Sequence, residues 1–355
     1  MHLKDVLSMR ARPAAGIFMA LTRRCPLSCE HCSTNSLISS EEYPEEMFYR
    51  FVKTFTPENK PDVILLTGGE PLLRPKLVID ITEWAHSIGT TVCLISGMFF
   101  ANQKEIPPLI IEALSGVDQF TASLDYYHEK QVPRAAVFRA LHQLLNQGKD
   151  VSLQIVGLNE HDPYLADVTK DVLDNFGNRV PMFVSKVGDI GRARNWLNKQ
   201  QLNSNIDINP EPCAMSAWPV VSFDGTIVAC CNQDVINGPA PSHLRLGHAA
   251  VDDWEKVRER LVNSNFLRAI RVFGPEYLTK QYGSEDQACD GYCSTCYKLS
   301  DNPIISERIE PLMKRSTIDF VEEKVLLFQQ KRQYGIPNYV HLVDVGYESG
   351  KEEIQ

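Results

Sequence analysis

Six short apolar segments, alternating with amphipathic stretches, occupy the first half of the chain and limit its possible folds more than any other feature. Several of the segments are almost wholly apolar, as parallel strands are when both faces of their sheet are covered. An open doubly wound sheet and a complete or partial barrel both fit this alternation, and in both the functional residues gather at the C-terminal ends of strands. The predicted strands are Gly16–Thr22, Asp62–Thr67, Thr91–Ser96, Gln119–Leu124, Val151–Val156 and Pro181–Lys186.

The rest of the chain divides into regions of different character. Beyond about residue 200 the alternation gives way to a polar stretch, NKQQLNSNIDINPEP, that we interpret as a linker. We expect a first domain at residues 1–200, a cysteine-bearing region at 201–300, and a helical tail at 301–355 with an amphipathic stretch at Ile318–Gln329. A helix ending near Gly148 is also predicted, because apolar residues repeat there at helical spacing: Val137, Leu141, Leu144 and Leu145.

Composition and charge narrow the function classes. The chain of 355 residues is 43% hydrophobic with a net charge of -9, so it offers no basic surface for nucleic acid or an anionic membrane. No apolar run reaches the roughly 18 to 20 residues of a membrane span, and the first residues do not resemble a secretion signal. We expect a cytoplasmic protein. Its ten cysteines then favour metal ligation or catalysis over disulfides.

Three thiols follow the first predicted strand: Cys25, Cys29 and Cys32, within eight residues of one another. Thiolates are soft ligands that suit iron-sulfur clusters and zinc. With three ligands, one coordination position on the metal stays open. A structural zinc site normally has four protein ligands, and His31 is poorly placed to turn onto the same ion.

The spacing Cys-x3-Cys-x2-Cys after a first strand resembles the signature of the radical S-adenosylmethionine (SAM) superfamily. The resemblance implies a partial (β/α)6 barrel and a 4Fe-4S cluster held by the three thiolates, with its fourth iron binding SAM. Reduction of such a cluster splits SAM to a 5'-deoxyadenosyl radical that abstracts hydrogen. His31 is a departure, because the family usually has an aromatic residue there beside the adenine, although imidazole can also stack.

Further segments at predicted strand ends extend the resemblance. Thr67-Gly68-Gly69-Glu70-Pro71 resembles the family's GGEP segment, which contacts the methionyl amino group, and glycines let backbone approach a ligand closely. Plain structural roles are the alternatives: a turn at the glycines, a strand end at Ser96, and a helix cap at Asp125. The cofactor-binding residues that the resemblance implies are Gly68, Gly69, Glu70, Pro71, Ser96, Ser123, Asp125 and Gln154, and Gly191-Arg192-Ala193 resembles a loop of enzymes with extra clusters.

Six of the ten cysteines lie between residues 213 and 296. The segment that begins at Cys213 has a predicted hairpin at Asp224-Gly225 and a later helix containing Trp254. It resembles the SPASM or Twitch extension of radical SAM maturases and dehydrogenases. Two fully ligated clusters would need eight thiols, so the resemblance implies one auxiliary 4Fe-4S cluster, held by Cys213, Cys230, Cys293 and Cys296. Cys231 and Cys289 stay open as replacements or as ligands of a second, incomplete cluster. A zinc site made from Cys289, Cys293, Cys296 and one earlier thiol is the structural alternative.

Tandem Cys230 and Cys231 cannot easily point both thiols at one metal, since neighbours in a strand face opposite sides. After the fourth strand, Tyr126 and His128 are candidates for a proton acceptor or radical relay, against the alternative of an ordinary polar loop. No other catalytic residue is assigned.

The resemblance implies an enzyme that abstracts hydrogen and then oxidises or crosslinks a peptide. The alternatives are a dehydrogenase or epimerase of a small molecule such as an aminocyclitol or sugar, a methylthiotransferase, and a non-catalytic metal-cluster scaffold. A reducing partner such as flavodoxin or ferredoxin is implied. Many peptide-modifying relatives add a leader-binding domain of about 80 to 90 residues, more than the 24 residues ahead of Cys25; we therefore expect a small substrate, a separate peptide-recognition protein, or recognition by the barrel.

Overall fold

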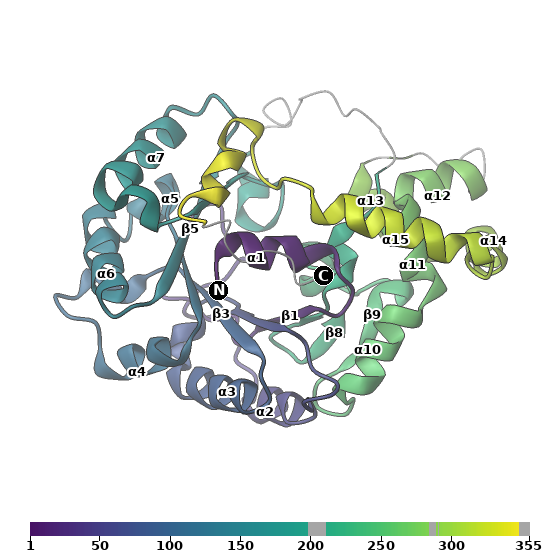
Figure 1. Cartoon of the computed structure of the whole chain (residues 1–355), viewed down its shortest axis with the longest axis horizontal. Coiled ribbons are helices and arrows are strands. Elements are labelled where there is room, and N and C mark those ends of the chain that lie inside the picture. The colour runs from purple at the N-terminus through teal and green to yellow at the C-terminus, as the bar shows by residue number, and fades with distance from the viewer. Residues whose placement is uncertain (198–210, 284–288, 290, 348–355) are drawn as a thin grey trace.

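A computed structural model describes residues 1–197, 211–283, 289 and 291–347 (Figure 1). All six predicted strands are present, each within two residues of its predicted ends. Their bounds are β1 Gly16–Ala20, β2 Val63–Thr67, β3 Thr91–Ser96, β4 Gln119–Ser123, β5 Asp150–Gly157 and β6 Met182–Lys186.

The order of the strands decides between the two architectures that the sequence left open. The strands pair in parallel in the order of the chain, from β1 to β6, with no switch point. A doubly wound sheet reverses its strand order partway, whereas a barrel does not. Among the described residues β6 does not pair with β1, so the sheet stays open. The fold is therefore α/β with a partial barrel.

Helices connect the strands and cover the outside of the sheet (Figure 1). They are α2 Glu46–Val52, α3 Pro75–Ser87, α4 Pro108–Gly116, α5 Tyr126–Glu129, α6 Arg134–Asn146 and α7 Pro163–Phe176. The helix predicted from apolar spacing is α6, which buries Val137, Leu141 and Leu144 against the core. It ends just before Gly148, whose φ of +78° is a backbone conformation that suits glycine.

The second cysteine region continues the same sheet. β7 Val220–Val221 pairs in parallel with the free edge of β1, and β8 Thr226–Val228 and β9 Arg245–His248 follow antiparallel. The predicted turn is present: Gly225 has a φ of +90°, and Asp224 Oδ1 accepts the Thr226 N–H at 2.9 Å. Because β1 is shared, the thiols beside β1 and those beyond β8 are tied to one sheet. The predicted linker lies largely outside the described residues.

The helices from Asn265 onward pack beside this extension around a smaller core of their own, which includes Ile270, Leu278 and Ile309, whereas Val235 and Trp254 of the two preceding helices belong to the main core. The last segment returns to the barrel, where Ile336 N–H donates to Val184 O of β6 at 2.9 Å. Among the described helices none is long and apolar enough to cross a membrane. The bounds are α9 Gln233–Asn237, α10 Trp254–Asn263, α11 Asn265–Phe273, α12 Pro275–Tyr282, α13 Tyr292–Lys298, α14 Pro303–Met313, α15 Ser316–Gln330 and the 3₁₀ segment Pro337–Asp344.

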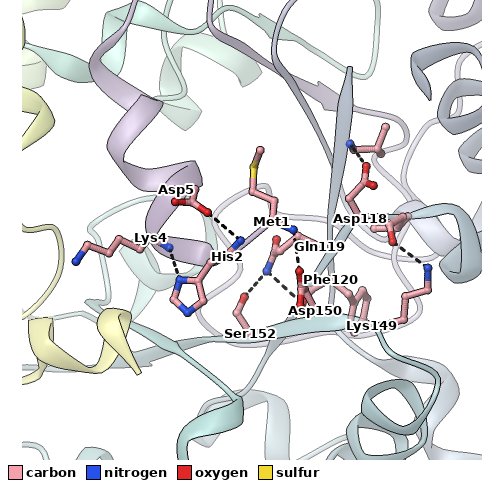
Figure 2. A network of polar contacts seen from close by, with 12 residues as sticks. Met1, His2, Lys4, Asp5, Asp118, Gln119, Phe120, Lys149, Asp150 and Ser152 are labelled. Atoms are coloured by element: carbon pink, nitrogen blue, oxygen red, sulfur yellow. Dashed lines mark hydrogen bonds and ion pairs between the residues drawn. The ribbon is translucent and has the colours of Figure 1, made fainter. Parts of the chain in front are cut away.

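The N-terminal ends of the strands are joined by polar contacts (Figure 2). Buried Gln119 at the start of β4 donates from Nε2 to Ser152 Oγ of β5 at 2.6 Å. α1 Leu3–Ser8 begins nearby, with His2 Nδ1 accepting the Lys4 N–H at 3.1 Å and Asp5 accepting the His2 N–H at 3.2 Å. These contacts organise this end of the barrel and leave the C-terminal strand ends for chemistry.

Candidate active site

A cavity of about 400 Å³ opens at the C-terminal ends of the barrel strands. All three cysteines of the first group, Cys25, Cys29 and Cys32, line it. Of the predicted cofactor-binding residues, the ones that line the cavity are Gly68, Gly69, Ser96, Ser123, Asp125 and Gln154. The cysteine loop and the ends of strands β1 to β7 therefore meet in one space, although Cys25 and Gln154 are more than 120 positions apart in the sequence.

The three thiols lie close enough to influence one another. Cys25 and Cys29 are buried, and Cys32 is half-buried. The pKa of the Cys25 thiol is raised to about 12, mainly by burial and also by the charges of Glu70, Cys29 and Cys32, against a lowering hydrogen bond from the Leu27 backbone. Without metal this thiol keeps its proton, so a metal that binds it must displace the proton.

The loop that carries these thiols is clamped by the segment after β6. Arg192 donates from Nε to Cys29 O at 2.8 Å, from Nη1 to Ser36 O at 2.7 Å, and from its backbone N–H to Cys32 O at 3.0 Å. Gly191 has a φ of +56°, and a Cβ there would lie 2.1 Å from Cys32 O. The Gly191-Arg192 pair thus fits directly against the cysteine loop, a structural role that the sequence did not assign to it.

The paired glycines after β2 hold the same loop from the other side. A Cβ on Gly68 would lie 2.5 Å from Thr22 O, and one on Gly69 would lie 2.4 Å from Arg24 O. Gly69 N–H also donates to Thr22 O at 2.6 Å. The sequence explained these glycines by approach to a ligand; the structure adds that they must also approach the chain leading into Cys25.

Glu70 is fully buried and is not among the residues that line the cavity. Its fully buried carboxylate accepts the Ser96 hydroxyl at 3.0 Å and the Gly97 N–H at 2.9 Å through Oε2, and the Leu72 N–H at 3.1 Å through Oε1. Burial raises its pKa to about 7, although these hydrogen bonds act in the opposite direction. Glu70 therefore joins the turn after β2 to the end of β3, and buried Pro71 is likewise not a lining residue.

Two histidines share one buried aspartate at the end of β4. Asp125 caps α5 by accepting the Tyr127 and His128 N–H groups at 2.9 and 3.0 Å. Its Oδ2 lies 2.7 Å from His128 Nδ1 and 3.2 Å from His31 Nε2. Burial alone would raise the pKa of Asp125, but the charges and hydrogen bonds of the two histidines lower it below its usual range.

The imidazole ring of His31 lines the cavity. Its ring stacks on Tyr127 with centroids 4.7 Å apart, and its Nδ1 is buried without a hydrogen-bond partner. His128 also lines the cavity, while the other catalytic candidate, Tyr126, is 54% exposed and is not among the lining residues. The two candidates thus lie in different surroundings.

The donor set fits a cluster that leaves one iron open. Three thiols reach the cavity, and the polar strand-end residues beside them can hold an amino-acid ligand. No three thiols in the described part of the chain have sulfur atoms within 4.8 Å of one another. Ligands of a single zinc ion stand roughly 3.8 Å apart, so this spacing favours a cluster with a separate iron for each thiolate.

A second group of thiols lies beyond β8. Burial raises the pKa of Cys230, and the charges of Cys231, Cys213 and Cys296 add to it. Burial likewise raises the pKa of Cys296, with the charges of Cys213 and Cys293 adding. Four thiols thus influence one another's pKa: Cys213, Cys230, Cys293 and Cys296. They come from the segment before β7, the end of β8 and helix α13. The set suits a four-thiolate cluster.

Of the two cysteines left open by the sequence, Cys231 lies near the other four, since its charge raises the pKa of both Cys230 and Cys293. Cys231 lines the barrel cavity, and its Sγ accepts from Arg10 Nη2 at 3.5 Å. Cys289 Sγ instead lies 4.0 Å from Glu276 O. Sequence analysis missed His243, whose Nε2 lies 3.8 Å from Cys296 Sγ, because a single histidine 53 positions away gives no spacing signal.

Comparison with known proteins identifies the first half of the chain. Residues 19–172, which hold the cysteine loop, the paired glycines and four of the barrel strands, match the radical SAM superfamily. This segment of the chain is therefore a radical SAM domain. The match ends before β6 and does not extend to the second thiol group.

Two relatives and one solved structure are similar to larger or smaller parts of this chain. YydG of Bacillus subtilis (strain 168), whose name refers to peptide biosynthesis, is 24% identical over 70% of this chain and 78% of YydG. An AdoMet-dependent heme synthase of Methanosarcina barkeri (strain Fusaro / DSM 804) is 34% identical over 30% of this chain and 29% of the synthase. Streptococcus suis SuiB bound to precursor peptide SuiA shares the fold, with a TM-score of 0.51 and 12% identity over 76% of this chain and 70% of SuiB.

Replacing Glu70 by Gln is expected to change how the stability of the metal-free protein depends on pH. The pKa of Glu70 is about 7 in the folded protein against an ordinary 4.5, so the folded state binds more protons between these values and loses stability as pH rises through them. Between pH 4.5 and 7, the free energy of unfolding of the parent should fall by roughly 2 to 3 kcal/mol more than that of Glu70→Gln.

Urea unfolding at a series of pH values measures this difference. The exposed Glu83→Gln variant is the matched control and should follow the parent. Parallel curves for the parent and Glu70→Gln would show that Glu70 does not titrate in this window.

Proposed function

We propose that this radical SAM enzyme cleaves SAM at the cavity and uses the resulting radical to oxidise or crosslink a peptide substrate. The observation that carries the proposal is the convergence of three thiols and six predicted cofactor-binding residues on one cavity at the strand ends. A 4Fe-4S cluster on Cys25, Cys29 and Cys32 would, when reduced, supply the electron that splits the sulfonium of SAM into methionine and a 5'-deoxyadenosyl radical.

The chain's own residues then have distinct tasks. The strand-end groups Ser96, Ser123 and Gln154 line the space where the polar parts of SAM would bind. Asp125 fixes the rings of His31 and His128 through two short contacts, so these rings form a rigid wall. Arg192 holds the backbone of the cysteine loop in place from outside.

A peptide is the substrate class that the comparisons favour. The alignment with YydG extends over most of both chains, and the name of that relative refers to peptide biosynthesis. The alignment with the heme synthase is confined to 30% of this chain. The cavity also reaches past the barrel to Gln233 and Ile236 of α9, which widens it on the side of the second thiol group. We propose that a separate protein or this surface recognises the peptide, and that a flavodoxin or ferredoxin supplies electrons.

We further propose an auxiliary 4Fe-4S cluster of the SPASM or Twitch kind on Cys213, Cys230, Cys293 and Cys296. Cys293 and Cys296 are three residues apart on α13, and so on one face of the helix. The other two thiols approach from the extension of the barrel sheet. Such a cluster, beside the cavity, would accept the electron that remains after hydrogen is removed from the substrate.

The tandem cysteines provide a matched pair for testing this ligand set. Cys230→Ala should lower the iron content of anaerobically reconstituted protein from about eight to about four per chain. Cys231→Ala should keep about eight, because its thiol faces the cavity and Arg10. Iron and sulfide analysis measures both. The reverse pattern would assign the ligand role to Cys231.

Replacing Cys25, Cys29 and Cys32 together by alanine should abolish SAM cleavage. The variant is expected to keep about four irons, to form no 5'-deoxyadenosine, and to show an electron paramagnetic resonance spectrum that SAM does not perturb. Cys93→Ala is the control, because Cys93 is buried within β3 and is not among the lining residues. Continued SAM cleavage by the triple variant would contradict the proposed site.

Mass spectrometry of candidate substrates separates the reactions. A peptide oxidised or crosslinked by this enzyme should lose two hydrogens per modification. Incorporation of solvent deuterium with no mass change in ordinary water would indicate epimerisation instead, and a gain of a methylthio group would indicate a methylthiotransferase. Activity on an aminocyclitol or sugar alone, with none on peptides, would overturn the proposed substrate class.

A further inference from the structure

We infer that two buried arginines, Arg10 and Arg271, provide the positive charge that balances the proposed auxiliary cluster and raises its reduction potential. This inference rests on the proposed function, because it requires a cluster on the C-terminal thiols. The arginines come from opposite ends of the chain, Arg10 from the segment just after α1 and Arg271 from α11. Neither was singled out by the sequence.

Arg271 is 6% exposed and forms no ion pair with any described residue. Its Nη atoms donate only to backbone carbonyls, those of Leu261 at 3.1 Å and of Ser216 and Val262 at 3.4 Å, and its Nε has no partner. Burial lowers its pKa to about 10, and the charge of Cys213 is among the groups that act against this. The neighbouring residue on α11, Ile270, accepts the backbone N–H of Cys213 at 3.2 Å, which fixes the thiol beside this helix.

Arg10 has the same character beside Cys231. It is 6% exposed and stacks over the rings of Phe18 and Trp218, with 4.8 and 5.1 Å from its Cζ to the ring centroids. Its Nη2 donates to Met215 O at 3.2 Å and to Cys231 Sγ at 3.5 Å, while Nη1 has no partner. No carboxylate in the described part of the chain pairs with it within ion-pair distance.

Two unpaired buried charges carry a substantial desolvation cost, which proteins normally offset with a partner of opposite sign. Glu322 is the carboxylate whose charge acts most strongly on the pKa of Arg271, but its Oε2 lies 2.8 Å from Arg268 Nη2 and forms an ion pair there. Arg271 lines a second cavity beside Cys213, but its Nη atoms donate to backbone carbonyls and its Nε is closed off from water. The counter-charge must therefore act through space.

A four-thiolate cluster supplies a counter-charge of the right sign and size. An oxidised 4Fe-4S core of charge about +2 with four thiolates carries about two net negative charges, and reduction adds a third. Two arginines thus match the oxidised cluster and favour its reduced form more strongly.

The test measures the potential of the auxiliary cluster by a redox titration followed by electron paramagnetic resonance. The background is the chain with Cys25, Cys29 and Cys32 changed to alanine, so that the signal comes from the C-terminal thiols alone. Arg271→Met and Arg10→Met remove the charge, Arg271→Lys and Arg10→Lys keep it, and exposed Arg258→Met controls for net charge.

Each Met variant should make one-electron reduction of the cluster about tenfold less favourable, which is a potential about 59 mV lower. The Lys variants and Arg258→Met should stay close to the parent. If a Met variant loses its iron and the matching Lys variant keeps it, the inference is also supported. Iron binding would then require the positive charge of the side chain and not its shape. Loss of iron in both, or equal potentials in all variants with iron bound, would overturn it.

The iron content of the background protein separates this failure from failure of the proposed function. About four irons per chain show that the auxiliary cluster exists, and the variants then decide the role of the arginines. A background protein without iron would remove the auxiliary cluster itself, and the inference with it.

Discussion

The site depends on the close backbone contact between the cysteine loop and two glycine-bearing turns. Gly68 and Gly69 press against the chain at Thr22 and Arg24, and Gly191 presses against Cys32 O, at distances that leave no room for a Cβ. These contacts come from β2 and β6, at two well-separated places on the sheet. The loop is therefore held between parts of the barrel that must themselves be correctly assembled, which makes the geometry of the thiols a property of the whole sheet.

The shared strand β1 links this loop to the rest of the chemistry. One edge of β1 pairs with β2 and the other with β7, so the cysteine loop and the second thiol group extend from a single framework. Cys230 and Cys231 follow β8 at the border between the two groups, with Cys231 lining the barrel cavity. A short route between cavity and second thiol group follows from this continuity, and electron transfer between the two would need such a route.

Buried polar groups are concentrated where the protein would hold its cofactors. Glu70, Asp125, Arg10 and Arg271 are each less than a tenth exposed. Glu70 and Asp125 are satisfied by donors from neighbouring turns and rings, whereas the two arginines keep unpartnered nitrogens. Satisfied groups make the framework rigid, and unsatisfied ones are a cost that a bound group of opposite charge can offset. Glu70 and Asp125 therefore stabilise the framework of the site, whereas the two arginines have charge that a bound group of opposite sign can balance.

The sequence by itself determined the six parallel strands, the α6 helix, the hairpin at Asp224-Gly225 and the likeness of the first segment to radical SAM domains, because these depend on local periodicity and on spacing within a few residues. Only the tertiary structure decided that the sheet is a partial barrel continued by β7, that the Glu70 carboxylate is held by the end of β3, and that Tyr126 lies at the surface. It also brought Arg192 to the cysteine loop, His243 to Cys296 and Arg10 to Cys231. Contacts between residues 53 to more than 200 positions apart leave no periodic signal, since they arise from the packing of complete elements.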